Sequence, residues 1–376
     1  MSLPLLGCSM GDPAGIGPEI LLAAAAELGG AAEPAAACLF LGDEAVFAAC
    51  AARLKGIRAP LTVASVAAAR EAVDDGDPGP YLLQCGALPA GLAPGHPRPA
   101  DGAAALAAIR EGAALAAAGA IDALVTAPLS KHGVAAHHPG FKGHTEFLAA
   151  LDGSDCPIML FAAPRPLPRP RPIAAQPDPP PGGEGAGEAP DPGPTPAADI
   201  ALLSTHLPLV TAIAMVGPAM VEAALRRLHA AWAERFGRDP VIGVAALNPH
   251  AGEHGAIGGE EPRLLAPAIS AVVGDGIDAR GPYPADSIFL RDDLDVILAL
   301  YHDQGTIMAK RAPWPTVNLT LGLSYVRTSP DHGTAYDLAG TGRADHRAML
   351  AAMHLAAQLA VEQDRDRPGS PLAASP

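Results

Sequence analysis

Short apolar runs alternate with alanine-rich stretches along most of this chain, and this alternation constrains its fold more than any other feature. The runs have the length of buried β-strands and cover residues 4–10, 37–41, 123–126, 200–203, 241–246, 296–300 and 317–321. Helical stretches cover 19–28, 44–54 and 103–118, and a final amphipathic one covers 345–362. Strands that alternate with helices form parallel sheets with helices on their faces. The sequence therefore predicts an α/β protein.

The length of the chain predicts more than one structural unit. At 376 residues it exceeds a single typical core, so we expect two α/β/α lobes, or one domain with a long insertion. Residues 164–199 hold 13 of the 41 prolines and almost no large apolar side chains. Such a segment cannot form a core, and we expect a disordered surface insertion rather than a proline-recognition site. The residues from Arg365 onward are expected to fray.

Charge and cysteine usage narrow the class of partner. The net charge of −15 argues against nucleic acids and anionic membranes, because both attract clustered Lys and Arg. Apolar stretches such as 20–26 are shorter than the roughly 20 residues that a membrane-spanning helix requires. The five cysteines include no CxxC pair, which predicts a reducing cytoplasm and no disulfide framework. A small metabolite is the expected partner.

Three histidines each follow a strand-like run, namely His206 in LLSTHLPL, His250 in AALNPHAGE and His302 in LALYHDQG. The carboxyl ends of parallel strands border the crevice where α/β sheets bind ligands, so these side chains can converge despite their separation in sequence. Neutral imidazoles leave the charge of a divalent metal uncancelled, which suits the ionisation of a substrate hydroxyl. The pattern predicts one metal site. The alternative is that each histidine only caps its strand or bonds to nearby backbone.

Several polar residues outside the histidine runs predict a site for an anion. Lys131 lies just past a strand end, and His144 and Thr145 lie at an expected helix start, where imidazole, hydroxyl and free amides can hold a phosphate. Thr145 could instead be a simple helix cap. Further on, two cations and an amide suit a phosphate or carboxylate, although the arginine could be an ordinary surface charge: Lys310, Asn318 and Arg327.

Three segments rich in glycine or proline are predicted to form loops with a defined backbone conformation. In GDPAGIGPEI, the glycines at 11, 15 and 17 allow a tight turn that either binds an anion or is purely structural. Asp286 in GPYPAD either contacts substrate or orders a neighbour. The stretch DHGTAYDLAGTG, residues 331–342, is typical of a loop that wraps around a cofactor, with a mobile surface loop as the alternative.

Eight motifs stand in one order along the chain: GDPAGIGPE, TAPLSKHG, GHTEFLA, THLPL, NPHAGE, GPYPAD, YHDQG and DHGTAYDLAGTG. Together they resemble the 4-hydroxythreonine-4-phosphate dehydrogenase family of vitamin B6 biosynthesis. The resemblance runs from Gly11 to about Asp345 and implies an isocitrate/isopropylmalate dehydrogenase-like fold, with two α/β/α lobes around a cleft. We expect residues 1–130 plus 305–376 in the first lobe and 131–304 in the second. The resemblance also implies homodimers whose sites lie at the subunit interface.

The resemblance implies a role for each group of candidate residues. It assigns the metal, expected to be zinc, cobalt or magnesium, to His206, His250 and His302. It assigns the substrate to His144, Thr145, Lys310, Asn318 and Arg327. It assigns NAD or NADP to a loop that includes Asp331, His332, Gly333, Asp337 and Gly340.

The reaction that the resemblance implies is oxidation of 4-phosphohydroxy-L-threonine at C3. The resulting β-keto acid, 2-amino-3-oxo-4-phosphobutanoate, then decarboxylates to 3-amino-2-oxopropyl phosphate. The proton acceptor stays open between Lys131, Asp286 and metal-bound hydroxide. Alternatives are a dehydrogenase of threonate or erythronate phosphate and, more distantly, a phosphate acyltransferase or a non-catalytic metal- or anion-binding protein.

Two features depart from the family pattern. The proline-rich insertion precedes the strand that leads to His206, where the family has a short connection. In addition, HAGEHGAIG stands where HAGEGGHxG is expected, so His254 replaces a glycine and Ala256 replaces a histidine. We expect that a neighbouring contact has moved or been lost, and His254 could compete for the metal.

Overall fold

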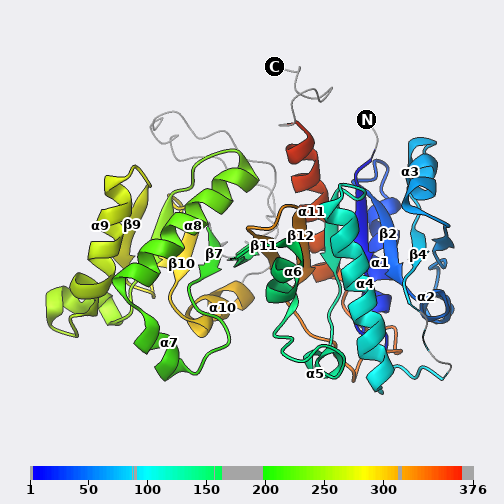
Figure 1. Ribbon diagram of the computed structural model, residues 1–376, viewed down its shortest axis with the longest axis horizontal. Coiled ribbons are helices and arrows are strands. Elements are labelled where there is room, and N and C mark those ends of the chain that lie inside the picture. The colour runs from blue at the N-terminus through cyan, green and yellow to red at the C-terminus, as the bar shows by residue number, and fades with distance from the viewer. Residues whose placement is uncertain are drawn as a thin grey trace, which may run out of the picture.

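One twelve-stranded sheet runs through the part of the chain that the structure describes (Figure 1). The computed structural model describes residues 3–86, 88, 91–155, 157–162, 198–311 and 316–365. The insertion predicted at 164–199 lies outside these residues except for Ala198 and Asp199, and the tail beyond Arg365 lies outside them entirely.

The strands and helices have the following bounds. The strands are β1 (Leu5–Ser9), β2 (Ala37–Gly42), β3 (Leu61–Thr62), β4 (Tyr81–Gln84), β5 (Ala123–Thr126), β6 (Ile158–Ala162), β7 (Asp199–Leu202), β8 (Ile242–Ala245), β9 (Ala279–Tyr283), β10 (Val296–Ala299), β11 (Val317–Leu321) and β12 (Val326–Pro330). The helices are α1 (Gly17–Gly29), α2 (Glu44–Ala51), α3 (Val66–Asp74), α4 (Pro99–Ala117), α5 (Lys131–Ala135), α6 (His144–Asp152), α7 (Leu209–Met215), α8 (Pro218–Phe236), α9 (Ala266–Gly274), α10 (His302–Arg311) and α11 (Arg347–Arg365). Short helical turns are η1 (Pro249–Gly255), η2 (Glu261–Leu265) and η3 (Ile288–Leu290).

The sheet consists of two parallel blocks joined by an antiparallel centre. Its strand order is β3-β4-β2-β1-β5-β12-β11-β6-β7-β10-β8-β9. The strands from β3 to β12 pair in parallel, as do β7, β10, β8 and β9. Strand β11 is antiparallel to both β12 and β6, and β6 is antiparallel to β7. The run predicted at 317–321 is therefore a strand, but it pairs in antiparallel fashion with both neighbours: a short connection reverses the chain between β11 and β12, and β6 comes from a distant part of the chain.

Helices cover both faces of the sheet, as Figure 1 shows, and the strand period divides the core between them. Leu6 and Cys8 of β1 face a core shared with α1, α8 and α11, whereas Leu5 faces a core shared with α4 and α6. All three side chains are fully buried. Continuous apolar runs such as these are typical of strands covered on both faces.

Local sequence signals explain where several helices begin. Asp43 caps α2 by accepting hydrogen bonds from the amides of Ala45 and Val46, and Ser65 caps α3 in the same way. Pro18 stands in the first turn of α1, where its missing N–H has no helical partner. Among the described residues no single helix is long and apolar enough to cross a membrane, and α7 with α8 passes that test only as a pair bent by 88°.

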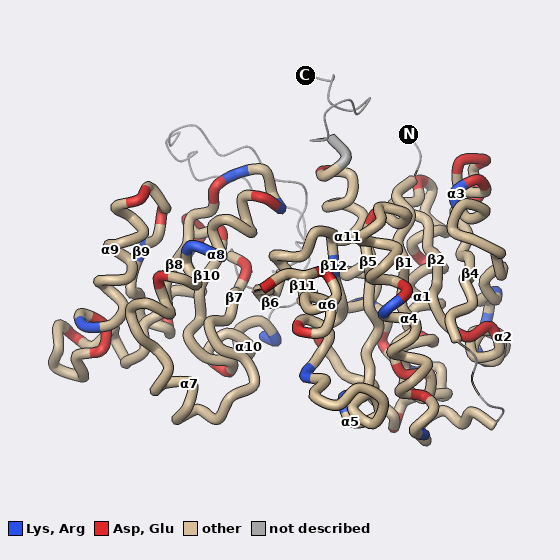
Figure 2. The backbone as a smooth tube through the Cα atoms, in the orientation of Figure 1, with Lys and Arg blue, Asp and Glu red and all other residues tan. Residues whose placement is uncertain are grey.

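Basic residues are few and are scattered among acidic ones (Figure 2). Several basic residues lie beside α5 and α6 and at the end of α10, near the middle of the molecule as Figure 2 shows it. A positively charged site in this acidic protein therefore depends on a few side chains.

Candidate active site

Three neighbouring strands lead to the predicted metal ligands. Strands β7, β10 and β8 are adjacent and parallel, so their carboxyl ends share one edge of the sheet. His206 follows β7, His302 begins α10 after β10, and His250 follows β8 in the turn η1. The topology therefore brings to one edge three histidines that are far apart in sequence.

His206 and His302 lie side by side at this edge, with their ring centroids 5.5 Å apart. Burial lowers the pKa of His206, and the charges of Lys131 and His302 lower it further, so the neutral form that a metal requires is favoured. His302 Nδ1 lies 2.7 Å from Asp303 Oδ1, which leaves Nε2 for a ligand. A carboxylate on the second ring nitrogen is the usual support of a metal-binding histidine.

His250 does not join the pair. Its Nδ1 lies 2.7 Å from Glu253 Oε1, which raises the pKa of His250, and its side chain is 62% exposed. Every residue from His250 to His254 has a positive φ, between 43° and 77°. Within the described ranges, no group of three His, Cys, Asp or Glu side chains is arranged to hold a metal ion. The structure thus brings together two of the three predicted ligands, and the conformation of η1 holds the third away from them.

Arg327 is a buried cation on β12, only 3% exposed. Its Nη1 donates to Thr320 Oγ1 at 3.0 Å and its Nη2 donates to Thr126 Oγ1 at 2.6 Å. Its Nε is buried and has no hydrogen-bond partner among the described residues. Burial lowers the pKa of Arg327 to about 10. A buried guanidinium held by two neutral hydroxyls, with an N–H still unpaired, is suited to bind an anion.

His144 and Lys131 lie close to this guanidinium. Burial lowers the pKa of His144 well below its usual value, and the charges of Arg327 and Lys131 lower it further. His144 Nε2 is buried without a partner among the described residues. A Cβ atom placed on Gly143 would lie 3.9 Å from Lys131 Nζ and 3.1 Å from Glu146 Oε2, so the ammonium and this carboxylate both lie at the start of α6. Two cations, an imidazole and a helix N-terminus therefore lie near one another here, and their role as a phosphate cradle stays a prediction.

Thr145 is not the N-cap of α6, which was the alternative to its predicted place in the anion site. Helix α6 begins at His144, and Gly143, with an extended backbone at φ 166°, occupies the cap position without a side-chain hydrogen bond. Thr145 thus lies inside the first turn, and the prediction that it is the N-cap is wrong, because glycine takes the extended conformation that the cap requires. Its place in the first turn remains compatible with contact to a bound anion.

Lys310 and Asn318 lie near the start of the predicted cofactor loop. Lys310 Nζ is 3.1 Å from Asp331 Oδ2 and 3.2 Å from Asp331 O, and Thr316 donates to the same carboxylate at 2.9 Å. Asn318 Nδ2 donates to Pro330 O at 3.3 Å, while its buried Oδ1 has no partner among the described residues. Alternate residues of a strand share a face, so Asn318 points to the same side of β11 as Thr320, which holds Arg327.

The two candidate proton acceptors lie in different places. The charge of Lys131 lowers the pKa of both His144 and His206, so Lys131 lies near both imidazoles. Asp286 is exposed after β9 and raises the pKa of His250. Asp286 therefore lies near His250, the predicted metal ligand that is apart from the other two.

The loop at 331–342 is bonded to the glycine-rich turn that follows β1. These bonds fix a segment for which a mobile loop was the alternative, and they give the first turn a structural role. They join Thr334 O to Ile16 N (3.0 Å), Tyr336 Oη to Asp12 Oδ2 (2.6 Å) and Gly340 N to Glu19 Oε1 (2.5 Å).

The other predicted members of this loop make fewer contacts. His332 Nδ1 lies 3.2 Å from Gly333 O, and its buried Nε2 has no partner among the described residues. Gly333 and Asp337 are exposed. The backbone of the loop, more than these side chains, is what the structure orders.

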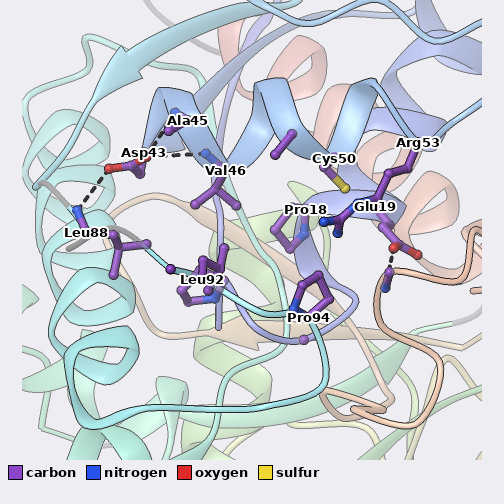
Figure 3. A pocket seen from close by; sticks show the side chains of 15 residues that line it. Pro18, Glu19, Asp43, Ala45, Val46, Cys50, Arg53, Leu88, Leu92 and Pro94 are labelled. Carbon is purple, nitrogen blue, oxygen red and sulfur yellow. Dashed lines mark hydrogen bonds between the residues drawn. The ribbon is translucent and has the colours of Figure 1, made fainter.

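A cavity of about 230 Å³ lies beside the end of this loop, between the starts of α1 and α2 (Figure 3). Gly340 forms part of its wall together with Glu19, Cys50 and Arg53. Most of the remaining lining is apolar, and Figure 3 shows the side chains of Val46 and Leu92 directed into it.

Several residues that shape the site were missed by sequence reasoning. Thr126 and Thr320 hold Arg327, and Tyr336 bonds Asp12. Thr126 ends the apolar run ALVT, and a hydroxyl at the end of a buried strand was the available signal. Thr320 lies inside a strand, and no local pattern marks it.

His254, where the family pattern has glycine, lies exposed on the same left-handed turn as His250. Ala256 follows the turn and bonds through its amide to Glu253 O at 3.1 Å.

The fold is that of an α/β protein, and the candidate site combines a buried arginine with a pair of histidines. The chain belongs to the family described as pyridoxal phosphate biosynthetic protein PdxA, whose profile matches residues 34–356. This membership confirms the resemblance seen in the motifs, and with it the predicted class of enzyme, an oxidoreductase.

Individual relatives align with this chain over nearly their whole length. The chain is 38% identical to a 4-hydroxythreonine-4-phosphate dehydrogenase of Acidithiobacillus ferrooxidans, over 95% of this chain and 96% of that protein. It is 35% identical to a D-threonate 4-phosphate dehydrogenase of Cupriavidus necator, over 96% and 98%. The crystal structure of 4-hydroxythreonine-4-phosphate dehydrogenase from Klebsiella pneumoniae matches with a TM-score of 0.76 and 30% identity, over 95% of this chain and 98% of that one. This match confirms the predicted fold class.

Proposed function

We propose that this chain oxidises the C3 hydroxyl of 4-phosphohydroxy-L-threonine with NAD or NADP. The product, 2-amino-3-oxo-4-phosphobutanoate, is a β-keto acid that loses carbon dioxide to give 3-amino-2-oxopropyl phosphate, as in vitamin B6 biosynthesis. The observation that carries the proposal is the buried Arg327, whose Nε has no partner among the described residues and whose charge acts on His144. Lys131 acts on His144 as well and also on His206, which pairs with His302. Near-full-length identity to 4-hydroxythreonine-4-phosphate dehydrogenases supports the choice of substrate.

The phosphate and carboxylate groups of the substrate require positively charged partners. We propose that Arg327, His144 and Thr145 hold one of these anionic groups, since unpaired donors and a helix N-terminus converge there. Lys310 and Asn318 hold the other group. Lys310 would then exchange its exposed bond to Asp331 for one to the substrate.

A divalent cation, which we propose to be zinc, cobalt or magnesium, would be held by His206, His302 and His250. The first two fit, because their rings are adjacent and His206 favours the neutral form. His250 fits by topology but must turn inward with η1. Its Nδ1 contact to Glu253 matches the contact of His302 to Asp303 and leaves Nε2 for the metal. When bound, such a cation supplies the positive charge that favours ionisation of the C3 hydroxyl.

Three candidates for the proton acceptor are Lys131, Asp286 and metal-bound hydroxide, and Lys131 is the better placed of the two side chains. Its charge acts on both His144 and His206, whereas Asp286 acts on His250. We propose that Lys131 takes or relays the proton of the hydroxyl, and that Asp286 does so only if η1 brings it inward.

We further propose that the loop at 331–342, with Asp331, His332, Gly333, Asp337 and Gly340, holds the nicotinamide dinucleotide. The enzyme would act in the cytoplasm as a homodimer whose sites lie at the subunit interface, without nucleic-acid or membrane partners. The division into lobes of 1–130 plus 305–376 and of 131–304 remains part of this proposal.

D-threonate 4-phosphate is the second candidate substrate, because relatives named for its oxidation match this chain almost as well. The two substrates share the phosphate and the C3 hydroxyl and differ at C2, where one has an amine and the other a hydroxyl. The described site contains no feature that selects between them.

The test follows nicotinamide reduction with both four-carbon phosphates, before and after chelation, in the wild type and in His302→Ala. We expect oxidation that chelation abolishes, that added zinc, cobalt or magnesium restores, and that His302→Ala lowers by about a hundredfold or more. His229→Ala is the matched control and should leave the rate unchanged, because it removes a histidine of α8 that pairs only with Asp239 in the described structure. Oxidation that survives both chelation and His302→Ala would refute the metal site.

A further inference from the structure

The cavity beside α1 and α2 contains an unused hydrogen-bond acceptor. Glu19 is 4% exposed, and its Oε1 accepts the Gly340 amide at 2.5 Å. Its Oε2 is buried and has no partner among the described residues. Burial raises the pKa of Glu19, while the amides of Gly340 and Gly342 and the charge of Arg53 lower it. A buried carboxylate oxygen without a partner is costly unless a ligand supplies a donor.

The other walls of the cavity suit a flat apolar ring. Pro13, Pro18 and Pro94 line it together with Val46 and Leu92 (Figure 3). Asp43 also faces it, but that carboxylate already accepts bonds from the amides of Ala45, Val46 and Leu88. Glu19 and Arg53 are therefore the polar groups left for a ligand, one an acceptor and the other a cation.

The size of the cavity indicates a part of a ligand rather than a whole one. Its volume of about 230 Å³ is below the roughly 300 Å³ at which pockets for complete small molecules begin. Such a space suits a fragment of a larger molecule that continues outside it.

The loop at 331–342 connects this cavity to the candidate active site. Asp331, at its first residue, contacts Lys310, and Gly340, near its last, forms the cavity wall. Gly340 has φ 77°, and a Cβ atom there would lie 2.8 Å from Pro94 Cβ, so glycine permits the close approach of loop and cavity. A ligand that follows the loop would have one end at the substrate and the other in the cavity.

We propose that this cavity binds the adenine end of the nicotinamide dinucleotide, with Glu19 Oε2 as the acceptor for the purine amino group and Arg53 facing its phosphates. This inference rests on the proposed function, which supplies the dinucleotide, and adds a subsite formed by α1 and α2. An adenine ring has the flat shape and the amino donor that the walls and the carboxylate require. Two phosphates between the rings match a cation at the rim.

Helix α2 provides a matched pair of variants for the test. Ala49 and Ala48 are neighbours and both are exposed, but Ala49 lines the cavity and Ala48 does not. Ala49→Trp should fill the cavity, whereas Ala48→Trp adds the same ring outside it. Ala45, which is also exposed and lines the cavity, offers a second blocking variant, Ala45→Trp, should the first be unstable.

The readout is calorimetric titration of the full chain with NAD and with ADP-ribose, which keeps the adenine end and lacks nicotinamide. We expect Ala49→Trp to weaken the binding of ADP-ribose by at least about tenfold, with Ala48→Trp equal to the wild type. The KM for the dinucleotide should rise with it, while the KM for the phosphorylated substrate stays unchanged. Thermal midpoints that match the wild type would show that the variants are folded.

Any of the following three outcomes would overturn the proposal. If Ala49→Trp and Ala45→Trp bind ADP-ribose like the wild type, the adenine lies elsewhere although the proposed function stands. If the wild type binds NAD but not ADP-ribose, the cavity holds no adenine. If it binds neither and oxidises no four-carbon phosphate, the proposed function fails together with the subsite.

Discussion

Arg327 and Arg235 are two buried arginines with opposite uses. Arg235 on α8 donates through Nη2 to the carbonyls of Leu323 and Tyr325, each at 3.1 Å, and so ties the helix to the β11–β12 hairpin. Arg327 instead donates to two threonine hydroxyls. Each of the two arginines keeps one buried nitrogen without a partner among the described residues, Nε in Arg327 and Nη1 in Arg235. Burial lowers the pKa of both. The partners, rather than the burial, separate a structural arginine from one that is placed for an anion.

Removal of each guanidinium should therefore have a different effect. Arg327→Met should raise the KM for the phosphorylated substrate by at least about tenfold, because a charged contact to the anion is lost. It should not lower the thermal midpoint, since a costly buried charge disappears. Arg235→Met should leave KM unchanged and cost roughly 1–3 kcal/mol of stability, because buried carbonyls lose their donor. Steady-state kinetics and thermal unfolding measure both effects, and an equal rise of KM in the two variants would contradict this assignment.

At the scale of elements, the turn η1 after β8 decides where His250 lies. Four residues with side chains, His250, Ala251, Glu253 and His254, adopt positive φ there. Each such residue costs roughly 1–2 kcal/mol, because its Cβ crowds the following carbonyl. Asn248 and Glu261 hold the base of the turn, with Glu261 accepting bonds from the amides of Leu247 and Asn248 at 3.0 and 2.7 Å. The strained conformation is therefore anchored from outside the turn.

A glycine in this turn should stabilise the protein. Ala251→Gly should raise the free energy of unfolding by roughly 0.5–1 kcal/mol, because glycine adopts positive φ without crowding. On α2 the same change, Ala48→Gly, should lower it by about 1 kcal/mol, since glycine is a poor helix former. Denaturant unfolding of both variants is the measurement. A loss of stability in Ala251→Gly would show that the turn has another conformation in solution.

At the scale of the whole molecule, α7 carries apolar side chains that stay exposed in the part of the chain that the structure describes. Leu209, Val210, Ile213 and Met215 are 54%, 82%, 41% and 48% exposed. Helix α7 follows His206 directly, so a partner subunit on this helix would lie beside the histidine pair. Exposed apolar groups of this kind are typical of a subunit interface. They support the proposed homodimer with sites at its interface.

The dimer should depend on this helix. Val210→Asp should convert a dimer into monomers, because it puts a charge into an apolar contact, and should lower activity with it. Val273→Asp on α9 changes another exposed valine, 49% exposed, and should leave the dimer intact. Sedimentation velocity of the full chain measures the oligomeric state. A monomeric wild type with full activity would exclude interface sites.

The strand-like runs and the family motifs could be read from the sequence because both depend on local order. The predicted runs at 37–41, 123–126 and 296–300 correspond to β2, β5 and β10, with ends within one residue. Five strands were missed: β3, β4, β6, β9 and β12. Strand β3 has only two residues, and β9 carries Arg280, Gly281 and Pro282 in place of an apolar run. The reversed direction of β11 was also missed, because pairing direction is a property of the whole sheet.

For the candidate site as well, some features follow from the sequence and others only from the tertiary structure. The sequence alone determined the family of the protein and named the candidate ligands and cations, because chemistry belongs to the side chain and motif order belongs to the chain. Only the tertiary structure decided that His206 meets His302 while η1 holds His250 apart, and that Thr126 and Thr320 hold Arg327. These contacts join residues that are distant in sequence, and their distances depend on strand order and on the backbone of one turn, which no local pattern specifies.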